Sequence, residues 1–428
     1  MMVLSQLNSS IGNHQNLSLA LKFSRFFIGI TLTAVLTILP GWAAEPGVSK
    51  TMIRIGGVMD LEGDSRGLGL GMKMGIEAAL KDQSIQGRSI EFVVLNDFYN
   101  PPTTVEATKQ LIDQGIFLML GNVGTPTAKV SLPILAEHRV PAVGFFTGAG
   151  LLRPGVGDVV NYRASYVQET ASAIEAALSV GVRPREICAY VQNDAYGMAG
   201  VAGIKTALIK QPGTSSVVEK LEQIMTLEGE DPDRNGIGPV GVYRRNTLSS
   251  RDGYKSLKKW EQENGTRCRL VVTVGTYEAI ANFIGYAHYK GEDWVFSAVS
   301  FTGADNLQEA LKAFGVTDGL IMTQVVPALD SPLPIVNDAR QALGDNLGYV
   351  SLEGYIVGRM LLDVLRNIKG PITREAFLEA ALGRGFDLGG LPIDFANDNQ
   401  GSDLVLLTQL SGNGYDVVDP LQLEKVFQ

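Results

Sequence analysis

A regular alternation of short apolar runs with amphipathic segments is the feature that most restricts how this chain can fold. Met52–Met59 is an apolar, β-branched run, and Gly69–Lys81 after it places apolar residues at helical spacing. The same order continues as far as Phe146 and begins again after Arg163. Strands that alternate with helices form βαβ units around a parallel sheet. The pattern therefore predicts an α/β fold with two lobes, each on its own sheet, and not one large sheet.

The expected strands are apolar runs that end at polar or turn-forming residues. They are Met52–Met59, Ile90–Leu95, Phe117–Leu120, Val140–Phe146, Ile187–Gln192, Val217–Lys220, Leu270–Val274 and Trp294–Ser297. The expected helices are Gly69–Lys81, Thr103–Gln114, Thr127–His138, Gln168–Val180, Met198–Lys210, Ser256–Asn264, Glu278–Tyr289 and Leu352–Asn367. A polar insertion is expected at Leu227–Val240, and strand-like pieces in the tail at Leu388–Ile393, Leu404–Leu410 and Tyr415–Val418.

Residues 1–43 are typical of a secretory signal peptide. They contain no Asp or Glu, and Lys22 and Arg25 precede an uncharged run, Phe26–Leu39. Gly41-Trp42-Ala43 fits the small-x-small exit, so the mature chain is expected to begin at Ala44. The alternative is an uncleaved anchor, but the run is shorter than the ~20 residues that span a bilayer as a helix. We therefore expect a periplasmic or secreted product with no membrane span.

The net charge argues against nucleic acid as a partner. It is −9 for the chain and becomes −11 once Lys22 and Arg25 leave with the signal peptide, whereas phosphate binding needs a surplus of basic residues. Two cysteines and three histidines leave little for a metal centre. Cys188 and Cys268 are either two small buried residues or a disulfide of an exported protein. We expect no metal and no cofactor.

A glycine run, Gly67-Leu68-Gly69-Leu70-Gly71, follows the first strand. The dinucleotide-binding pattern GxGxxG would need a glycine at position 74, where the chain has Met74. We therefore interpret the run as a flexible strand-to-helix loop. The sequence also lacks the phosphate-loop, HExxH and GxSxG motifs, so an enzyme is not expected.

Polar and aromatic residues gather where the expected strands end. The segment 122–127, NVGTPT, presents backbone N–H groups, hydroxyls and a helix N-terminus, which together can receive a carboxylate; the alternative is that Thr125 only caps the helix. Segments 145–148, 193–197 and 275–277 close other strands in both lobes. Ligands of open α/β sheets bind beyond the carboxyl ends of strands, so these ends predict one cleft.

The chain resembles the leucine/isoleucine/valine-binding family of periplasmic solute-binding proteins. The resemblance covers Ile53 to about Leu410 and rests on the order of several motifs, IRIGGVMDLEG, NVGTPT, VPAVGFFTGAG, QNDAYGMAG, VGTYEAI, TQVVP and SLEGY. It implies two Rossmann-like lobes with parallel sheets, joined by three hinge crossings near Ala164, Gln324 and Asp387. The N-terminal lobe is then 50–164 and 325–387, and the C-terminal lobe 165–324 and 388–428. The strands that begin near Cys188 and Leu270 would be neighbours.

The resemblance also implies a ligand site. The loop with Gly124 and Thr125 would grip a carboxylate, and Tyr196 and Tyr277 would close over the ligand. The candidate ligand-binding residues are Leu68, Val123, Gly124, Thr125, Phe145, Phe146, Thr147, Tyr196, Tyr277, Ser300 and Tyr349. Amino-acid binders of the family often place an acid after the fourth strand of the second lobe. Here the stretch 298–303 around Ser300 has none, and the next acid is Asp305.

The resemblance implies an exported binding protein of an ABC importer, with a small carboxylate-bearing solute, an amino acid or a related organic acid, as ligand. A membrane permease would be its partner, and the chain would be a monomer. The alternative is a sensing module that feeds a membrane receptor, and a third is a nucleotide-dependent enzyme.

Overall fold

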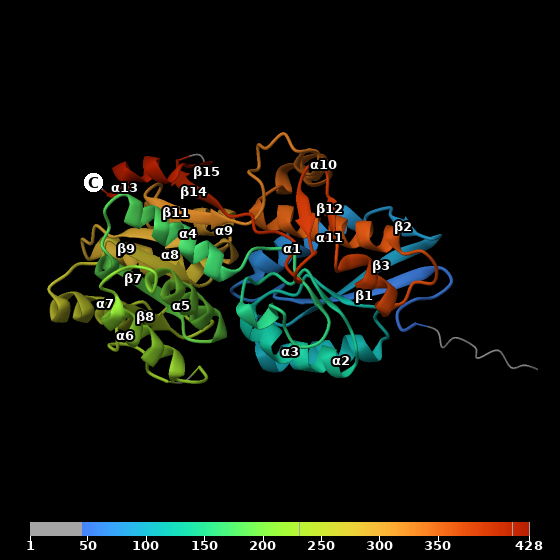
Figure 1. Cartoon of the computed structure of the whole chain (residues 1–428), viewed down its shortest axis with the longest axis horizontal. Coiled ribbons are helices and arrows are strands. Elements are labelled where there is room, and N and C mark those ends of the chain that lie inside the picture. The colour runs from blue at the N-terminus through green and yellow to red at the C-terminus, as the bar shows by residue number, and fades with distance from the viewer. Residues whose placement is uncertain (1–44, 231, 413, 428) are drawn as a thin grey trace, which may run out of the picture. The chain divides into compact units, whose positions relative to one another are not determined.

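The computed structural model describes residues 45–230, 232–412 and 414–427. The predicted signal peptide, 1–43, lies outside them. No helix in the described part of the chain is long and apolar enough to cross a membrane. Two main sheets, each with its own helices, and one small hairpin make up the strands described (Figure 1). The predicted α/β class with two largely parallel sheets is confirmed.

The first sheet has the strand order β2-β3-β1-β4-β5-β6, and its pairs are parallel except β2–β3. Its strands are β1 (Met52–Met59), β2 (Ser84–Ile85), β3 (Arg88–Asn96), β4 (Met119–Leu120), β5 (Ala142–Val143) and β6 (Val159–Val160). The strand predicted at Val140–Phe146 is wrong in length, since only the two residues of β5 form it. The residues after β5 leave the sheet as a loop, where Phe146 makes an isolated bridge to Val123.

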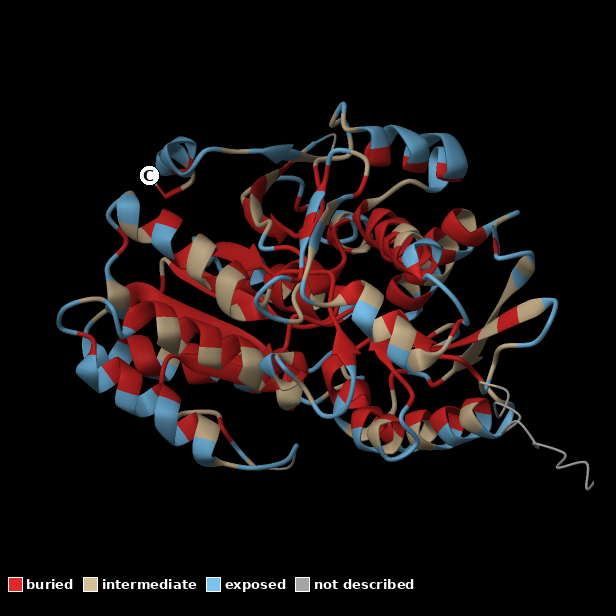
Figure 2. Cartoon of the chain, turned by 45° about the vertical axis from the view of Figure 1, so that its right-hand side comes forward, coloured by how far each residue is buried: buried red, intermediate tan, exposed pale blue. Residues whose placement is uncertain are grey.

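The second sheet has the order β15-β14-β11-β10-β9-β7-β8, with β14 and β15 antiparallel at one edge. Its strands are β7 (Ile187–Gln192), β8 (Val240–Tyr243), β9 (Leu270–Val274), β10 (Val295–Ala298), β11 (Leu320–Gln324), β14 (Leu406–Ser411) and β15 (Gly414–Val417). β7 and β9 match their predictions residue for residue and are buried along their whole length. Burial on both faces is what a parallel sheet covered by helices requires, and Figure 2 shows these strands enclosed beneath partly exposed helices.

The helices alternate with the strands and bury one face each. They are α1 (Arg66–Leu80), α2 (Pro101–Asp113), α3 (Thr125–Glu137), α4 (Tyr166–Ser179), α5 (Ala195–Leu208), α6 (Ser215–Thr226), α7 (Arg251–Asn264), α8 (Tyr277–Tyr289), α9 (Ala304–Lys312), α10 (Pro334–Leu343), α11 (Tyr349–Asn367), α12 (Arg374–Ala381) and α13 (Glu424–Phe427). Short 3₁₀ turns are η1 (Gly150–Leu152), η2 (Pro184–Glu186), η3 (Ser300–Thr302), η4 (Gly344–Asn346) and η5 (Pro420–Leu423).

The strand predicted at Val217–Lys220 is wrong, because these residues lie within helix α6. The buried residues of α6 are Val217, Val218, Leu221 and Ile224. Their spacing is that of one helical face, and the pair of valines, which favours strands in isolation, is overridden by that longer pattern.

The glycine run after β1 is not a flexible loop, and that prediction is wrong. All its residues lie in α1. A Cβ atom on Gly69 would come within 1.9 Å of the carbonyl oxygen of Asp60 at the end of β1, and one on Gly75 within 2.0 Å of the carbonyl oxygen of Ser351 in α11. Glycine is therefore present because α1 packs its backbone directly against its neighbours.

The tail differs from its prediction at Leu388–Ile393. Most of this segment is the turn between β12 (Gly385–Asp387) and β13 (Pro392–Asp394), which form the small hairpin. Gly389 and Gly390 in the turn have positive φ angles of 65° and 84°, which favour glycine over other residues. The strand-like pieces predicted at Leu404–Leu410 and Tyr415–Val418 correspond to β14 and β15.

Cys188 and Cys268 form a disulfide, which decides between the two hypotheses left open by the sequence. Their Cα atoms are 5.6 Å apart, within the ~4.4–6.8 Å that a disulfide spans. Cys188 lies on β7, and Cys268 precedes its neighbour β9. The bond therefore ties the amino-terminal ends of two adjacent strands.

Candidate functional site

The eleven predicted ligand-binding residues are all buried and all follow carboxyl ends of strands or begin a helix beside them. They follow β1 (Leu68), β4 (Val123, Gly124, Thr125), β5 (Phe145, Phe146, Thr147), β7 (Tyr196), β9 (Tyr277) and β10 (Ser300), and Tyr349 begins α11. Side chains that follow neighbouring parallel strands lie at one edge of the sheet, so each sheet presents its candidates together.

In the first sheet, the loops after β4 and β5 are joined. The alternative that Thr125 caps α3 is wrong, since Gly124 occupies the N-cap position at φ +110°. The hydroxyl of Thr125 instead lies 2.6 Å from that of Thr147, and the Gly124 N–H donates to the carbonyl of Phe146 at 3.2 Å. Two buried hydroxyls beside a helix N-terminus form a polar spot that can bind an anion.

Aromatic rings from both sheets meet next to this spot. Phe301, which follows β10, has its ring centre 5.1 Å from Phe146, 4.7 Å from Tyr196 and 6.3 Å from Tyr99. Tyr196 is also 5.2 Å from Tyr166. All five side chains are at most 1% exposed. The rings therefore form a buried apolar surface that can contact the apolar part of a ligand.

Hydrogen bonds connect the loops of the two sheets directly. The Gly67 N–H at the start of α1 donates to the hydroxyl of Tyr277 at 3.3 Å. The carboxylate of Asp305 in α9 accepts from the Tyr349 N–H at 3.0 Å. Its negative charge interacts favourably with the dipole at the N-terminus of α11. The candidates from the two sheets are therefore in contact, as residues of one cleft would be when it is closed.

Tyr99 makes a further bridge between the sheets. Gln192 at the end of β7 donates to its hydroxyl at 3.1 Å, and Asn246 donates to the carbonyl of Phe98 at 3.3 Å. Phe98 and Tyr99 have φ angles of +54° and +52°, a region that non-glycine residues adopt at a cost. The strained pair places the Tyr99 ring against Gly124, whose missing Cβ would lie 2.3 Å from that ring.

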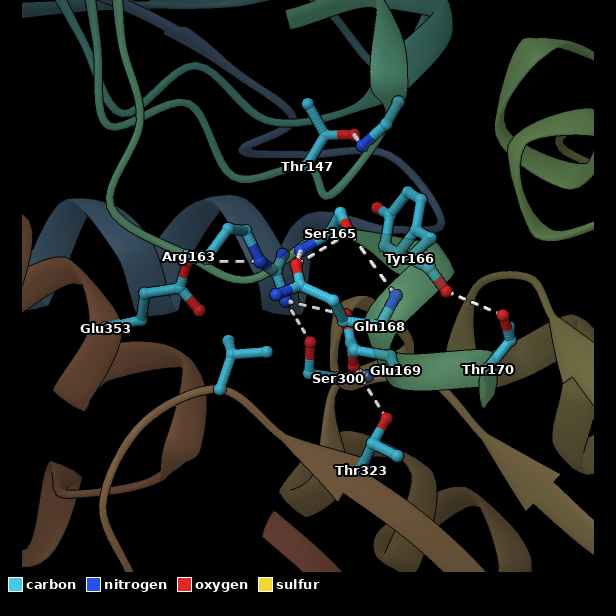
Figure 3. Close-up of polar contacts among 12 residues, drawn as sticks. Thr147, Arg163, Ser165, Tyr166, Gln168, Glu169, Thr170, Ser300, Thr323 and Glu353 are labelled. Carbon is cyan, nitrogen blue, oxygen red and sulfur yellow. Dashed lines mark hydrogen bonds and ion pairs between the residues drawn. The ribbon is translucent and has the colours of Figure 1, made fainter. Parts of the chain in front are cut away.

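Figure 3 shows a charged cluster in which Arg163 lies between Glu353 of α11 and Glu169 of α4. Its Nε is 3.5 Å from Glu353, and its Nη2 is 3.7 Å from Glu169 and donates to the hydroxyl of Ser300. All three charged side chains are at most 3% exposed. The guanidinium also lies 4.7 Å from the ring centre of Phe146, so the cluster belongs to the same site as the predicted residues.

The carboxylate of Glu169 lies against the segment 298–303, which has no acidic residue of its own. Its carboxylate accepts from the Ser300 N–H at 2.8 Å and from the Thr323 hydroxyl at 2.6 Å. The stretch 298–303 therefore contacts a carboxylate that comes from another helix. Local sequence does not indicate this contact, because the two residues are 131 positions apart.

Burial and charge perturb the ionisation of this cluster. Burial raises the pKa of Glu353 to about 7, and the positive charge of Arg163 opposes that rise. Burial alone would lower the pKa of Arg163, but Glu353 and Glu169 together hold it above its ordinary value. Arg163 is therefore cationic at any physiological pH, whereas Glu353 exchanges a proton near neutrality.

A narrow pocket runs through the site. Phe146, Ser300, Tyr349, Gln324 and Glu353 are among its lining residues, and it is too narrow to hold a water molecule. Entry of a solute therefore requires these side chains, or the sheets that carry them, to move apart. Among the described residues no group of His, Cys, Asp and Glu could hold a metal ion.

Comparison with known proteins places the chain in a family. A possible leucine/isoleucine/valine-binding protein from Rhodopirellula baltica SH 1 is 33% identical, with a TM-score of 0.78, and the match covers 89% of this chain and 100% of that one. The chain belongs to the type I periplasmic binding protein family. The family model described as periplasmic binding protein matches residues 52–224, and no curated protein matches.

Two more distant structures share the periplasmic binding protein fold. A branched chain amino acid ABC transporter from Thermus thermophilus with bound valine has 17% identity and a TM-score of 0.67, over 87% of this chain and 96% of that one. A solute binding protein of an ABC transporter from R. palustris in complex with 4-hydroxybenzoate has 15% identity and a TM-score of 0.67, over 86% and 95%.

Sequence reasoning missed four residues of this binding protein's site: Tyr99, Arg163, Glu169 and Glu353. One signal was available, because Glu353 falls on the apolar face of the amphipathic segment that became α11. A charged residue on such a face must find a partner when it is buried. Nothing local to Arg163 or Glu169 indicates which partner that is.

Proposed function

We propose that this binding protein is the exported solute-binding component of an ABC importer. It captures a small carboxylate-bearing solute, an amino acid or a related organic acid, between two lobes and passes it to a membrane permease. The proposed lobes are 50–164 with 325–387 and 165–324 with 388–428, and the proposed signal peptide ends near Ala43. The protein acts as a monomer in the periplasm, binds without catalysis and needs no cofactor.

The observation that carries this proposal is the contact between strand-end residues of both sheets. Tyr277 and Gly67, Tyr349 and Asp305, and the rings around Phe301 come from opposite sheets and are in contact, and the rings, Tyr277 and Tyr349 are buried there. A site divided in this way is complete only when the lobes close. Proteins of similar structure support the class of solute: besides the three described above, which are associated with leucine/isoleucine/valine, valine and 4-hydroxybenzoate, they include a fatty acid ABC transporter substrate-binding protein from Thermomonospora curvata.

Closure of the lobes strengthens the hydrogen bonds that select a carboxylate. The hydroxyls of Thr125 and Thr147 and the rings beside them are fully buried. In such a dry site each hydrogen bond to a carboxylate is stronger than in water, and an unsatisfied partner is more costly. The solute therefore supplies the free energy that holds the lobes together.

A thermal-shift screen of the exported chain tests the proposal. The panel is L-valine, L-leucine, 4-hydroxybenzoate and octanoate, with glucose and urea as solutes without a carboxylate. A true ligand at 100 times its Kd adds about 2.7 kcal/mol to the free energy of unfolding. We expect one carboxylate to raise Tm and to reduce the radius of gyration in small-angle scattering.

Stabilisation by glucose or urea and by no carboxylate would contradict the proposed class of solute. A cross-linked pull-down from membranes identifies the partner. Recovery of a permease supports import, and recovery of a receptor in its place contradicts it.

A further inference from the structure

The guanidinium of Arg163 is poorly satisfied for a group so deeply buried. It is 1% exposed, and among the described residues it makes one hydrogen bond, from Nη2 to Ser300, while Nε and Nη1 have no hydrogen-bond partner there. Its two acidic neighbours stand at 3.5 and 3.7 Å, beyond the ~2.7–2.9 Å of a charge-assisted hydrogen bond. A buried arginine with free N–H groups calls for an acceptor.

Arg163 lies directly behind residues that line the narrow pocket. Its guanidinium lies over Phe146 at 4.7 Å and near Tyr166 at 5.9 Å. Ser300, its hydrogen-bond partner, and Glu353, its neighbour, both line the narrow pocket. The unpartnered N–H groups therefore lie next to the place where the lobes would enclose a solute.

We propose that Arg163 is the anion-binding residue of the cleft, that it takes the carboxylate of the solute, and that Glu353 is the internal anion which competes for it. The assignment rests on the proposed function and deepens it. The hydroxyls of Thr125 and Thr147 carry no charge, so Arg163 supplies the full positive charge that a carboxylate needs after it leaves water. Glu169 stays with its two donors, since its Oε2 already accepts from the Ser300 N–H and the Thr323 hydroxyl.

Competition by Glu353 gives the binding of a carboxylate a defined pH dependence. Burial raises the pKa of Glu353 to about 7 when the cleft is closed, and a second carboxylate beside it raises the pKa further. The charged groups that face Glu353 are Arg163, Glu169 of α4 and Arg153 after η1. The charge of Glu353 also acts on the Tyr162 hydroxyl and raises its pKa. When the lobes part, water returns the pKa toward its ordinary value near 4.5.

Proton linkage sets the direction in which carboxylate affinity changes with pH. The closed, solute-bound form holds a proton on Glu353 that the open form releases, so closure takes up a proton between the two pKa values. Affinity for a carboxylate is therefore highest below about pH 4.5, falls as the pH rises toward the pKa of Glu353 in the closed form, about 7 or above, and is level beyond it. The primary amide of the same solute lacks the negative charge of the carboxylate and should show neither the dependence on Arg163 nor this pH profile.

The test compares three variants by calorimetry, using the carboxylate of the panel that gives the largest Tm shift and its primary amide. Arg163→Met should weaken carboxylate binding about 10- to 100-fold. Glu353→Gln should tighten it several-fold at pH 8 and abolish the difference between pH 6 and pH 8. The matched control is Glu261→Gln. Glu261 is a buried, ion-paired glutamate that contacts Cys268 and Trp294 at the opposite ends of the strands, so its substitution should change neither the carboxylate affinity nor the difference between pH 6 and pH 8.

The outcomes separate this inference from the proposed function. If no carboxylate of the panel binds, the proposed class of solute fails, and the role of Arg163 fails with it. If a carboxylate binds but Glu353→Gln weakens it, or the amide binds equally well, Arg163 is only a structural partner of its two acids and the inference is overturned. Should Arg163→Met not fold, the Glu353→Gln variant and the pH profile of the unchanged protein still decide.

Discussion

The disulfide between Cys188 and Cys268 should make a large contribution to the stability of the second sheet and its helices. The cross-link spans 80 residues of sequence, which include α5, α6, β8 and α7. Cross-linking a loop of this length lowers the entropy of the unfolded chain by an amount worth about 4.5 kcal/mol at 25 °C. Relaxation of the native and unfolded states usually reduces the measured value, so we expect a loss of about 2–4.5 kcal/mol in Cys188→Ala/Cys268→Ala.

The assay is urea unfolding of the double variant and of the unchanged protein, followed by circular dichroism. Alanine is the appropriate replacement because both cysteines are at most 1% exposed and a buried hydroxyl would add its own penalty. The midpoint should fall and the m value should rise, because an unfolded chain without the cross-link exposes more surface. The unchanged protein in reducing agent is the control, and its unfolding curve should approach that of the variant.

An unaltered midpoint and m value in the double variant would refute the reasoning, since they would mean that the bond does not restrict the unfolded chain. A lower midpoint with an unchanged m value would assign the loss to packing around the missing sulfur atoms.

Three further substitutions test the site and the packing around it. Thr125→Ala removes the hydroxyl 2.6 Å from that of Thr147 and should weaken carboxylate binding by about 1.5–3 kcal/mol, while loss of this buried bond lowers the free energy of unfolding by about 0.5–1.5 kcal/mol; unchanged affinity by calorimetry would contradict its role. Tyr99→Phe removes the bond from Gln192 and should shift closure toward the open form by about 0.5–1.5 kcal/mol, seen as a larger radius of gyration in solution. In Gly69→Ala the added Cβ would stand 1.9 Å from the carbonyl oxygen of Asp60, so the free energy of unfolding should fall by about 2–4 kcal/mol. A loss below about 0.5 kcal/mol would show that α1 can shift to make room.

Much of this fold could be predicted from local pattern. β7 and β9 match their predicted residues, since an unbroken apolar run can be satisfied only by burial on both faces of a sheet. Val217–Lys220 failed because four residues are too few to separate a strand from one face of α6. The glycine run failed because glycine permits both a loop and a close contact, and only the neighbouring backbone of Asp60 shows which applies.

The alternation of strands and helices follows from local sequence pattern, and so does the gathering of polar and aromatic residues at the strand ends. Which of these residues meet depends on how the two sheets and their helices pack. Arg163 and Glu169 are six positions apart, but Glu353 follows Arg163 by 190 positions, and nothing in local composition shows that the three meet. Periodicity is a property of neighbours along the chain, whereas the partner of a buried charge depends on how distant segments pack.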